Sequence, residues 1–160
     1  MSAICNVARV TIRPYIDADQ EELLDVWYRA SLIAHSFLSE EFFETERHEF
    51  AEQWLPAAET MVYEIDGRVV GFVALIGNEV GAIFVDPDSQ GRGIGRALMD
   101  TARESRPYLE LDVFAANSIG RRFYEAYGFT MVDRHMNESV GQPELRLRLG
   151  RLLPHEGGAA

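Results

Sequence analysis

Asp86-Pro87-Asp88-Ser89-Gln90-Gly91-Arg92-Gly93-Ile94-Gly95 is the stretch of this chain that decides the fold. An apolar, strand-like run at 82–85 precedes it, and a helical pattern opens at Arg96. Glycine at every second position removes side chains from the loop, so that successive backbone N–H groups can converge on one anion. The N-terminus of the following helix adds partial positive charge. The stretch therefore predicts a cradle for a pyrophosphate.

Three phosphate-binding patterns compete for this loop. A Walker loop requires Lys and then Ser or Thr after its last glycine, but Arg96 follows Gly95 here. A dinucleotide fingerprint, G-x-G-x-x-G/A, fails whether it starts at Gly91 or at Gly93. The third pattern, Q/R-x-x-G-x-G/A, is met by Gln90, Gly93 and Gly95. It resembles the acyl-CoA loop of the GNAT (Gcn5-related N-acetyltransferase) superfamily.

A second segment carries the same resemblance. After a strand-like run at 109–114, the chain reads Asn117-Ser118-Ile119-Gly120-Arg121-Arg122-Phe123-Tyr124-Glu125-Ala126-Tyr127-Gly128-Phe129. This is similar to the N-x-x-A-x-x-F-Y-E-x-x-G-F segment of the superfamily. Gly120 departs from the usual Ala, at a cost of about 1 kcal/mol in helix propensity, and is expected to touch no catalytic group. A third stretch, 27–38, resembles one branch of small bacterial GNAT acetyltransferases.

Composition sets the outer limits. The 160 residues are expected to form one N-acetyltransferase domain at 1–153, followed by a loose tail at 154–160. The sequence predicts neither a membrane span nor a signal peptide. The formal charge of −11 argues against nucleic-acid binding, which requires a basic face. The single cysteine, Cys5, cannot form an internal disulfide and suits a reducing cytoplasm.

Periodicity and turn residues predict the element order of an α/β fold. Strands are expected at 9–13, 61–65, 68–76, up to Val85, 109–114, 130–136 and 144–149. Helices are expected after Asp19, from about Glu40 to a stop at Pro56, at 92–105 and at 118–127. Asp19 is expected to cap the first helix together with Glu22, and Asp66-Gly67 to form a hairpin turn. Alternating Leu and Arg at 145–149 predicts a solvated outer strand or part of a dimer edge.

The GNAT resemblance implies a single-domain α/β (mixed α+β) fold. Its central sheet would be mixed and mostly antiparallel, with about four flanking helices. The parallel strands four and five, which end at Val85 and Phe114, would splay apart and leave a slot for the pantetheine arm of acetyl-CoA.

The resemblance also implies where acetyl-CoA binds, with no metal expected. The pyrophosphate would lie on the N–H groups of residues 91–96, and the Val85 N–H would polarise the thioester carbonyl as the oxyanion forms. Asn117 would hydrogen-bond the pantetheine arm, cap the following helix, or do both. The predicted cofactor-binding residues are Phe84, Val85, Gln90, Gly91, Arg92, Gly93, Ile94, Gly95, Arg96 and Asn117.

Tyr124 is the predicted catalytic acid. Acyl transfer from a thioester to an amine expels a thiolate, and a thiol pKa of roughly 8.5 makes this leaving group basic enough to benefit from a proton. A phenol, with a reference pKa of roughly 10, is protonated at neutral pH and can supply that proton. The family places the Tyr of its Phe-Tyr pair near the CoA sulfur. The alternative for Tyr124 is a purely structural role as a core aromatic residue.

Two residues compete as the base that takes a proton from the incoming ammonium. Glu79 stands at the start of the fourth strand, where some family members carry a base that acts directly or through water. His35 lies in a helix-to-helix turn that lines the acceptor pocket in the superfamily. The simpler interpretations are a solvated carboxylate for Glu79 and a residue that bridges the turn for His35. The sequence leaves the base open.

These observations predict a cytoplasmic, acetyl-CoA-dependent N-acetyltransferase that acetylates a primary amine by direct attack in a ternary complex. No residue suggests an acyl-enzyme nucleophile. The alternatives are a non-catalytic acyl-CoA-binding sensor and an acetyltransferase that acts on protein N-termini or lysines. The acidic stretch 40–59 is either a solvated helix face or a field that attracts cationic amines. The sequence also allows a homodimer.

Overall fold

The computed structural model describes residues 7–150, so Cys5 and the tail at 154–160 lie outside the described residues. The strands are β1 (Val10–Pro14), β2 (Glu59–Ile65), β3 (Arg68–Ile76), β4 (Glu79–Val85), β5 (Tyr108–Phe114), β6 (Thr130–Asn137) and β7 (Gln142–Gly150). The helices are α1 (Gln20–Ala34), α2 (Glu40–Glu49), α3 (Leu55–Ala57), α4 (Ile94–Arg103) and α5 (Ser118–Tyr127). A π-helix, η2 (Phe50–Trp54), joins α2 to α3, and the 3-10 turns η1 (Asp17–Asp19) and η3 (Pro87–Ser89) precede α1 and follow β4.

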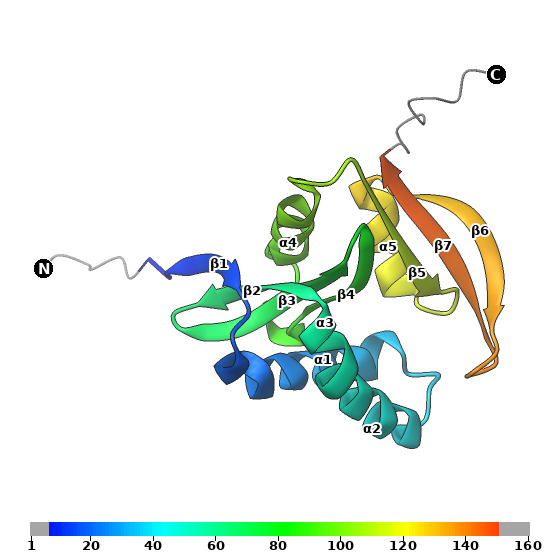
Figure 1. The fold of residues 1–160 in the computed structure, drawn as a ribbon, viewed down its shortest axis with the longest axis horizontal. Helices are drawn as coiled ribbons and strands as arrows, with labels where there is room; N and C mark the ends of the chain where they lie inside the picture. Colours follow the sequence, from blue (N-terminus) through cyan, green and yellow to red (C-terminus); the bar gives the residue numbers. More distant parts are fainter. Residues whose placement is uncertain (1–6, 151–160) are drawn as a thin grey trace, which may run out of the picture.

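The strands form one sheet in the order β1-β2-β3-β4-β5-β7-β6 (Figure 1). Within the described sheet, β4 and β5 are the one parallel pair of neighbours. They pair only where Glu79 lies beside Glu110, and they diverge from there toward Val85 and Phe114 (Figure 1). The predicted fold class, a mixed and mostly antiparallel sheet with splayed strands four and five, is therefore confirmed.

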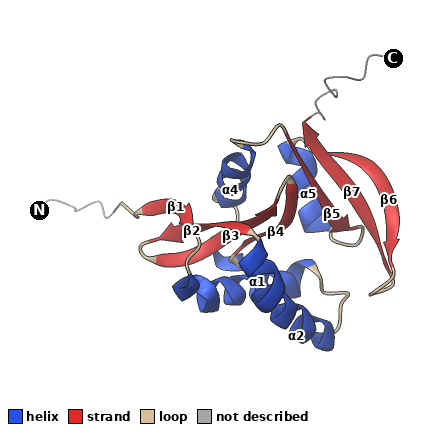
Figure 2. Ribbon diagram, viewed as in Figure 1, coloured by secondary structure: helices blue, strands red, loops and turns tan. Residues whose placement is uncertain are grey.

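Helices cover both faces of this sheet (Figure 2). On one face, α1 and the segment α2–η2 enclose a core that includes Phe72, and on the other face α4 encloses a core that includes Val73. Successive residues of β3 enter opposite cores because side chains alternate along a strand, and seven of its nine residues are buried. Within residues 7–150, no helix combines the length and the apolar character needed to cross a membrane.

Several turns agree with the sequence prediction. Asp66 at φ 50° and Gly67 at φ 82° place both central residues of the β2–β3 hairpin in the left-handed region, as a type I′ turn requires. Helix α4 begins at Ile94 rather than at 92, because Gly93 at φ 78° is its N-cap. Pro56 lies in the last turn of the continuous helical run formed by α2, η2 and α3, where it cannot donate a helical hydrogen bond, and the run ends one residue beyond it.

The predicted capping box at the start of α1 is wrong. Asp19 lies in η1, and its carboxylate accepts two hydrogen bonds of 2.8 Å from the guanidinium of Arg13 and one of 2.9 Å from the N–H of Ile16. Glu22 instead accepts the N–H of Val69 at 2.8 Å, across the interface between α1 and β3. Both carboxylates that the local spacing had assigned to the start of α1 are therefore hydrogen-bonded to residues outside this helix.

The prediction of an outer strand at 145–149 is also wrong. β7 lies between β5 and β6, so both of its edges are paired. Its leucines, Leu145, Leu147 and Leu149, enter the core beneath α4. Its arginines point to the other face, where Arg146 and Arg148 both bond Glu110 at 2.7 Å. The alternation reflects an inner strand with one charged face rather than a free edge.

Candidate active site

The glycine loop at the head of α4 owes its shape to two different constraints. Gly91 and Gly93 have φ values of 80° and 78°, a region that side-chain-bearing residues rarely adopt. No atom lies within 4 Å of a Cβ built at either position, so backbone conformation alone calls for glycine there. Gly95 lies in the first turn of α4, and a Cβ at that position would approach the Phe123 ring to 3.1 Å. Gly95 therefore allows α4 and α5 to pack closely.

Arg29 of α1 bonds the two aspartates at the start of this loop, a role that the sequence did not predict. Its guanidinium bonds the buried carboxylate of Asp86 at 2.5 Å and that of Asp88 at 2.9 Å. Asp86 also accepts the N–H of Asp88 at 2.9 Å, and the Gln90 side chain donates to the Val85 carbonyl at 3.1 Å. The available signal for this partner was the pair of aspartates that directly follows the apolar strand, because a carboxylate buried there requires a cation.

One cavity of about 880 Å³ brings most of the predicted site together. Its lining includes nine of the ten predicted cofactor-binding residues together with Tyr124 and His35, whereas Arg92 and Glu79 are outside the lining. Residues of α1 and α2–η2 line it from one face of the sheet, and residues of α4 and α5 line it from the other. The cavity therefore passes through the sheet where β4 and β5 diverge.

His35 and Asn117 meet inside this cavity. The Nε2 atom of His35 lies 3.3 Å from the side-chain Nδ2 of Asn117, and the ring stands edge-on to Phe84 and Phe114. Burial among these rings lowers the pKa of His35 to about 4, so the imidazole is neutral at pH 7. Asn117 caps α5, since its Oδ1 accepts the N–H of Gly120 at 2.9 Å.

The structure explains why glycine stands at position 120. A Cβ at this position would lie 2.6 Å from Nδ2 of Asn117, whose side chain folds over the first turn of α5. The side chain that a Cβ at Gly120 would meet is thus that of a predicted cofactor-binding residue, Asn117, and none of the predicted catalytic residues lies within 4 Å among the nearest atoms. Glycine leaves room for the Asn117 amide to point at His35 while it also caps the helix.

Tyr124 lies half-buried on α5 beside the cofactor loop. Its ring centroid lies 5.4 Å from that of Phe123 and 5.6 Å from that of Phe129, and both contacts are edge-to-face. Burial raises the pKa of its hydroxyl, which keeps the phenol protonated at neutral pH. No hydrogen bond from another residue in 7–150 occupies this hydroxyl. The group is thus free to donate a proton into the cavity.

Glu79 lies at the closed end of the splay. The Arg146 guanidinium grips its carboxylate with two bonds, of 2.6 and 2.5 Å, and Arg146 also bonds Glu110. The carboxylate therefore belongs to an ion-pair network on the sheet face. The structure brings Tyr124, His35 and Asn117 to one cavity and leaves Glu79 outside its lining.

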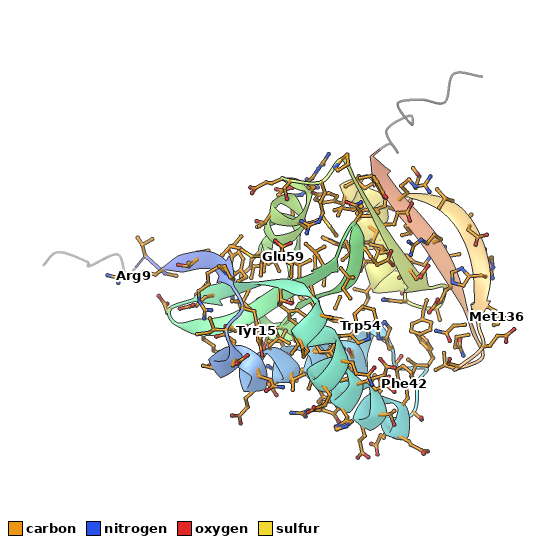
Figure 3. All side chains as sticks on the ribbon, viewed as in Figure 1. Arg9, Tyr15, Phe42, Trp54, Glu59 and Met136 are labelled. Carbon is orange, nitrogen blue, oxygen red and sulfur yellow. The ribbon has the colours of Figure 1, made fainter. Side chains whose placement is uncertain are left out.

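The helical layer contributes residues that were not among the predicted catalytic or cofactor-binding residues, although two of them, Glu46 and Glu49, belong to the acidic stretch 40–59. Phe42, Glu46, Glu49 and Trp54 line the cavity from α2 and η2. Phe42 and Trp54 both lie in the helical layer below the sheet (Figure 3). A Cβ at Gly81 would come within 2.7 Å of the Trp54 ring, so β4 needs glycine where this indole covers it. Aromatic rings and carboxylates thus form the wall opposite the cofactor loop.

A second group of side chains that could ligate a metal ion lies at the rim of the cavity. One carboxylate oxygen or imidazole nitrogen from each member lies within 4.8 Å of those of the other two, and the members are Asp112, His135 and Glu144. Their protein partners account for this arrangement: Arg146 bonds Asp112 at 3.2 Å, and Asn137 bonds Glu144 at 2.8 Å. His135 and Glu144 also contact each other at 3.0 Å. The expectation of a metal-free enzyme stays a prediction.

Comparison with known proteins identifies the class to which this fold and cavity belong. The family described as "Acetyltransferase (GNAT) domain" matches residues 56–131, a span that contains the whole of β2 to α5. The chain is also more than 30% identical to a known relative over 88% of its own length and 95% of that relative's length. The chain belongs to the GNAT acetyltransferase family, and it is an acetyl-CoA-dependent N-acetyltransferase.

Particular relatives narrow the comparison. The chain is 34% identical over 142 residues to peptidyl-lysine N-acetyltransferase YjaB of Escherichia coli K12, with 88% of this chain and 95% of the relative covered. Identity to peptidyl-lysine N-acetyltransferase YiaC of the same strain is 33% over 121 residues, covering 73% and 83%. The solution structure of apo YjaB superposes with a TM-score of 0.78 at 31% identity, covering 89% and 99%. The PaiA N-acetyltransferase of Thermoplasma acidophilum, solved with coenzyme A, shares the fold with a TM-score of 0.76 at 21% identity, covering 89% and 99%.

Proposed function

We propose that this enzyme acetylates lysine side chains of proteins or peptides by direct transfer from acetyl-CoA. The observation that carries the proposal is the cavity that crosses the sheet: the glycine loop lies at one end, and an aromatic wall with Glu46 and Glu49 lies at the other. A lysine side chain suits such a wall, because its apolar stem packs on aromatic rings while its ammonium seeks carboxylates. The relatives YjaB and YiaC, both named peptidyl-lysine N-acetyltransferases, support the same acceptor class.

The roles of the cofactor residues follow from their positions. The N–H groups of residues 91–96 would bind the pyrophosphate, helped by the positive end of α4. The slot between β4 and β5 would hold the pantetheine arm beside Asn117, and the N–H of Val85 would stabilise the oxyanion at the thioester carbon. Tyr124 would protonate the departing thiolate, a role its protonated and unpartnered hydroxyl suits.

Direct transfer within a ternary complex, without an acyl-enzyme intermediate, is favoured by the composition of the lining. The cavity wall within residues 7–150 includes no cysteine, and its serine, Ser89, is buried in the turn that follows β4. A nucleophile that forms a covalent intermediate needs an adjacent activating base. The imidazole of His35 is instead in contact with Asn117.

The acceptor class can be tested with peptides of matched sequence. One peptide carries a free α-amine and norleucine in place of lysine, and a second has a blocked α-amine and one lysine. Small diamines and amino sugars form the third group, and release of free CoA thiol is followed with mass spectrometry of the products. We expect acetylation of the blocked lysine peptide to be fastest. Exclusive acetylation of α-amines or of small amines would contradict the lysine proposal, and acetyl-CoA binding without turnover of any acceptor would favour a sensor.

A further inference from the structure

The charged side chains that line the cavity are mostly acidic. They are Glu46, Glu49, Asp112 and Glu144, together with Arg96 at the cofactor end. The rim carboxylates already have partners, since Arg146 bonds Asp112 and Asn137 bonds Glu144. Glu46 and Glu49 differ, because no hydrogen bond or ion pair from the described part of the chain reaches either carboxylate. The wall opposite the cofactor loop therefore presents two uncompensated negative charges.

Glu46 is the more enclosed of these two residues. It is half-buried on α2, whereas Glu49 is exposed one turn further along the same helix face. Burial and the Glu49 carboxylate raise the pKa of Glu46 above that of an ordinary glutamate. A half-buried carboxylate without a counterion is stabilised by a cation that enters the cavity.

The other candidate bases are engaged elsewhere. Arg146 holds the Glu79 carboxylate with two short bonds at the closed end of the splay. The Nε2 atom of His35 accepts a hydrogen bond from the Asn117 amide. A base needs a free lone pair within hydrogen-bond reach of the proton that it abstracts.

We propose that Glu46, with Glu49 beside it, receives the ammonium group of the acceptor lysine and takes its proton. This inference rests on the lysine acetyltransferase function proposed above. The proton passes from nitrogen to the Glu46 carboxylate, and the freed lone pair forms the N–C bond at the thioester carbon. The C–S bond breaks with its electron pair on sulfur, which takes the Tyr124 proton. The second nitrogen proton returns to the Tyr124 oxygen, and Glu46 releases its proton to water.

Two acceptors separate this role from a merely structural one. The first is a blocked peptide with one lysine, whose amine pKa of about 10.4 makes it cationic at pH 7.5. The second is the same peptide with an aminooxy group in place of the amine, which is already neutral at that pH. In Glu46→Gln we expect kcat/KM for the lysine peptide to fall about 10²-fold, the lower end for loss of a positioned base. For the aminooxy peptide the loss is expected to stay within about threefold, since no proton must be removed before attack.

Three further variants control this comparison. Glu44→Gln changes an exposed glutamate of the same helix, outside the cavity lining, and should match wild type with both acceptors. Glu46→Asp keeps the carboxylate and should recover part of the lysine activity lost in Glu46→Gln. Calorimetric binding of CoA should be unchanged in each variant, which verifies the fold and the cofactor loop. Glu79→Gln should show no dependence on the acceptor.

Distinct outcomes contradict distinct claims. An equal loss of kcat/KM with both acceptors in Glu46→Gln, or no loss with the lysine peptide, would overturn the role of Glu46. The proposed lysine function would still stand. An acceptor-dependent loss in Glu79→Gln instead would overturn the role of Glu46 and assign the base to Glu79. A wild-type enzyme that acetylates neither peptide would contradict the proposed lysine function itself.

Discussion

The imidazole of His35 accepts a hydrogen bond from the side-chain amide of Asn117, which links the end of α1 to the start of α5 across the cavity. The Oδ1 atom of Asn117 is occupied by the N–H of Gly120, so its NH₂ group faces Nε2. An amide NH₂ can only donate, and Nε2 must therefore carry the lone pair while Nδ1 carries the proton. While this contact persists, Nε2 has no free lone pair for a substrate proton, and His35 positions Asn117.

The buried, neutral His35 predicts a pH-dependent stability. Its pKa is lowered from 6.5 to about 4 in the folded protein, so the unfolded chain binds more protons between these values. The free energy of unfolding should therefore decrease as the pH falls from about 6.5 toward 4. Urea titrations at pH 7.5 and pH 5 should show a smaller decrease in His35→Gln than in wild type. The exposed His48→Gln should follow wild type, and equal decreases in all three proteins would contradict the prediction.

Loss of the Tyr124 hydroxyl should abolish most turnover without affecting cofactor binding. Tyr124→Phe keeps the ring that packs on Phe123 and Phe129, so the fold and the Kd for CoA should be preserved. We expect kcat to fall about 10²–10⁴-fold, the usual worth of a positioned proton donor. Tyr127→Phe is the matched control, because that hydroxyl also lies at the cavity but already bonds Asp100. If both variants turned over like wild type, Tyr124 would have only a packing role.

Substitutions in the glycine loop should weaken CoA binding for two separable reasons. Gly93→Ala must adopt φ 78°, a left-handed strain of roughly 1–2 kcal/mol, and should lower both stability and CoA affinity. Gly95→Val adds atoms against the Phe123 ring and should lower CoA affinity by moving α4 away from α5. Calorimetry and circular dichroism measure these effects.

A control exists for the strain itself. Gly77 has φ 59° in the β3–β4 turn, away from the cavity lining, with nothing within 4 Å of a Cβ. Gly77→Ala should therefore lower stability and leave the Kd for CoA unchanged. If Gly93→Ala and Gly95→Val bound CoA as tightly as Gly77→Ala, the loop would not be the pyrophosphate site.

Removal of Arg29 should disorganise the cofactor loop from the opposite face of the sheet. Arg29→Met leaves Asp86, which is 3% exposed, without its counterion. Because Arg29 itself is partly exposed, we expect a decrease in unfolding free energy that is smaller than for a fully buried pair but larger than in the control below. CoA affinity should fall as well. Glu59→Gln breaks an exposed pair with Arg106 and should cost less than about 1 kcal/mol, with normal CoA binding. An unchanged CoA affinity in Arg29→Met would contradict this role.

Local sequence was sufficient where one element determines its own geometry. The β2–β3 hairpin follows from Asp66-Gly67, and helix α5 runs over the residues expected for it, because turn conformation and helix ends depend on neighbouring residues. The spacing of Gln90, Gly93 and Gly95 was enough to indicate the cofactor loop, since glycines at alternate positions leave backbone N–H groups accessible to an anion. The family motif at 117–129 then indicated the fold.

Only the tertiary structure decided which side chains share the cavity and which are held elsewhere. Arg29 reaches Asp86 across 57 positions of sequence, and Asn117 reaches His35 across 82, distances over which no local pattern carries information. Sequence spacing could not show that the Glu79 carboxylate is bonded by Arg146. Nor could it show that, within residues 7–150, the Glu46 carboxylate has no hydrogen-bond or ion-pair partner. The partner of a charged group depends on which strands lie side by side, and strand order is set by burial of the whole sheet rather than by any one segment.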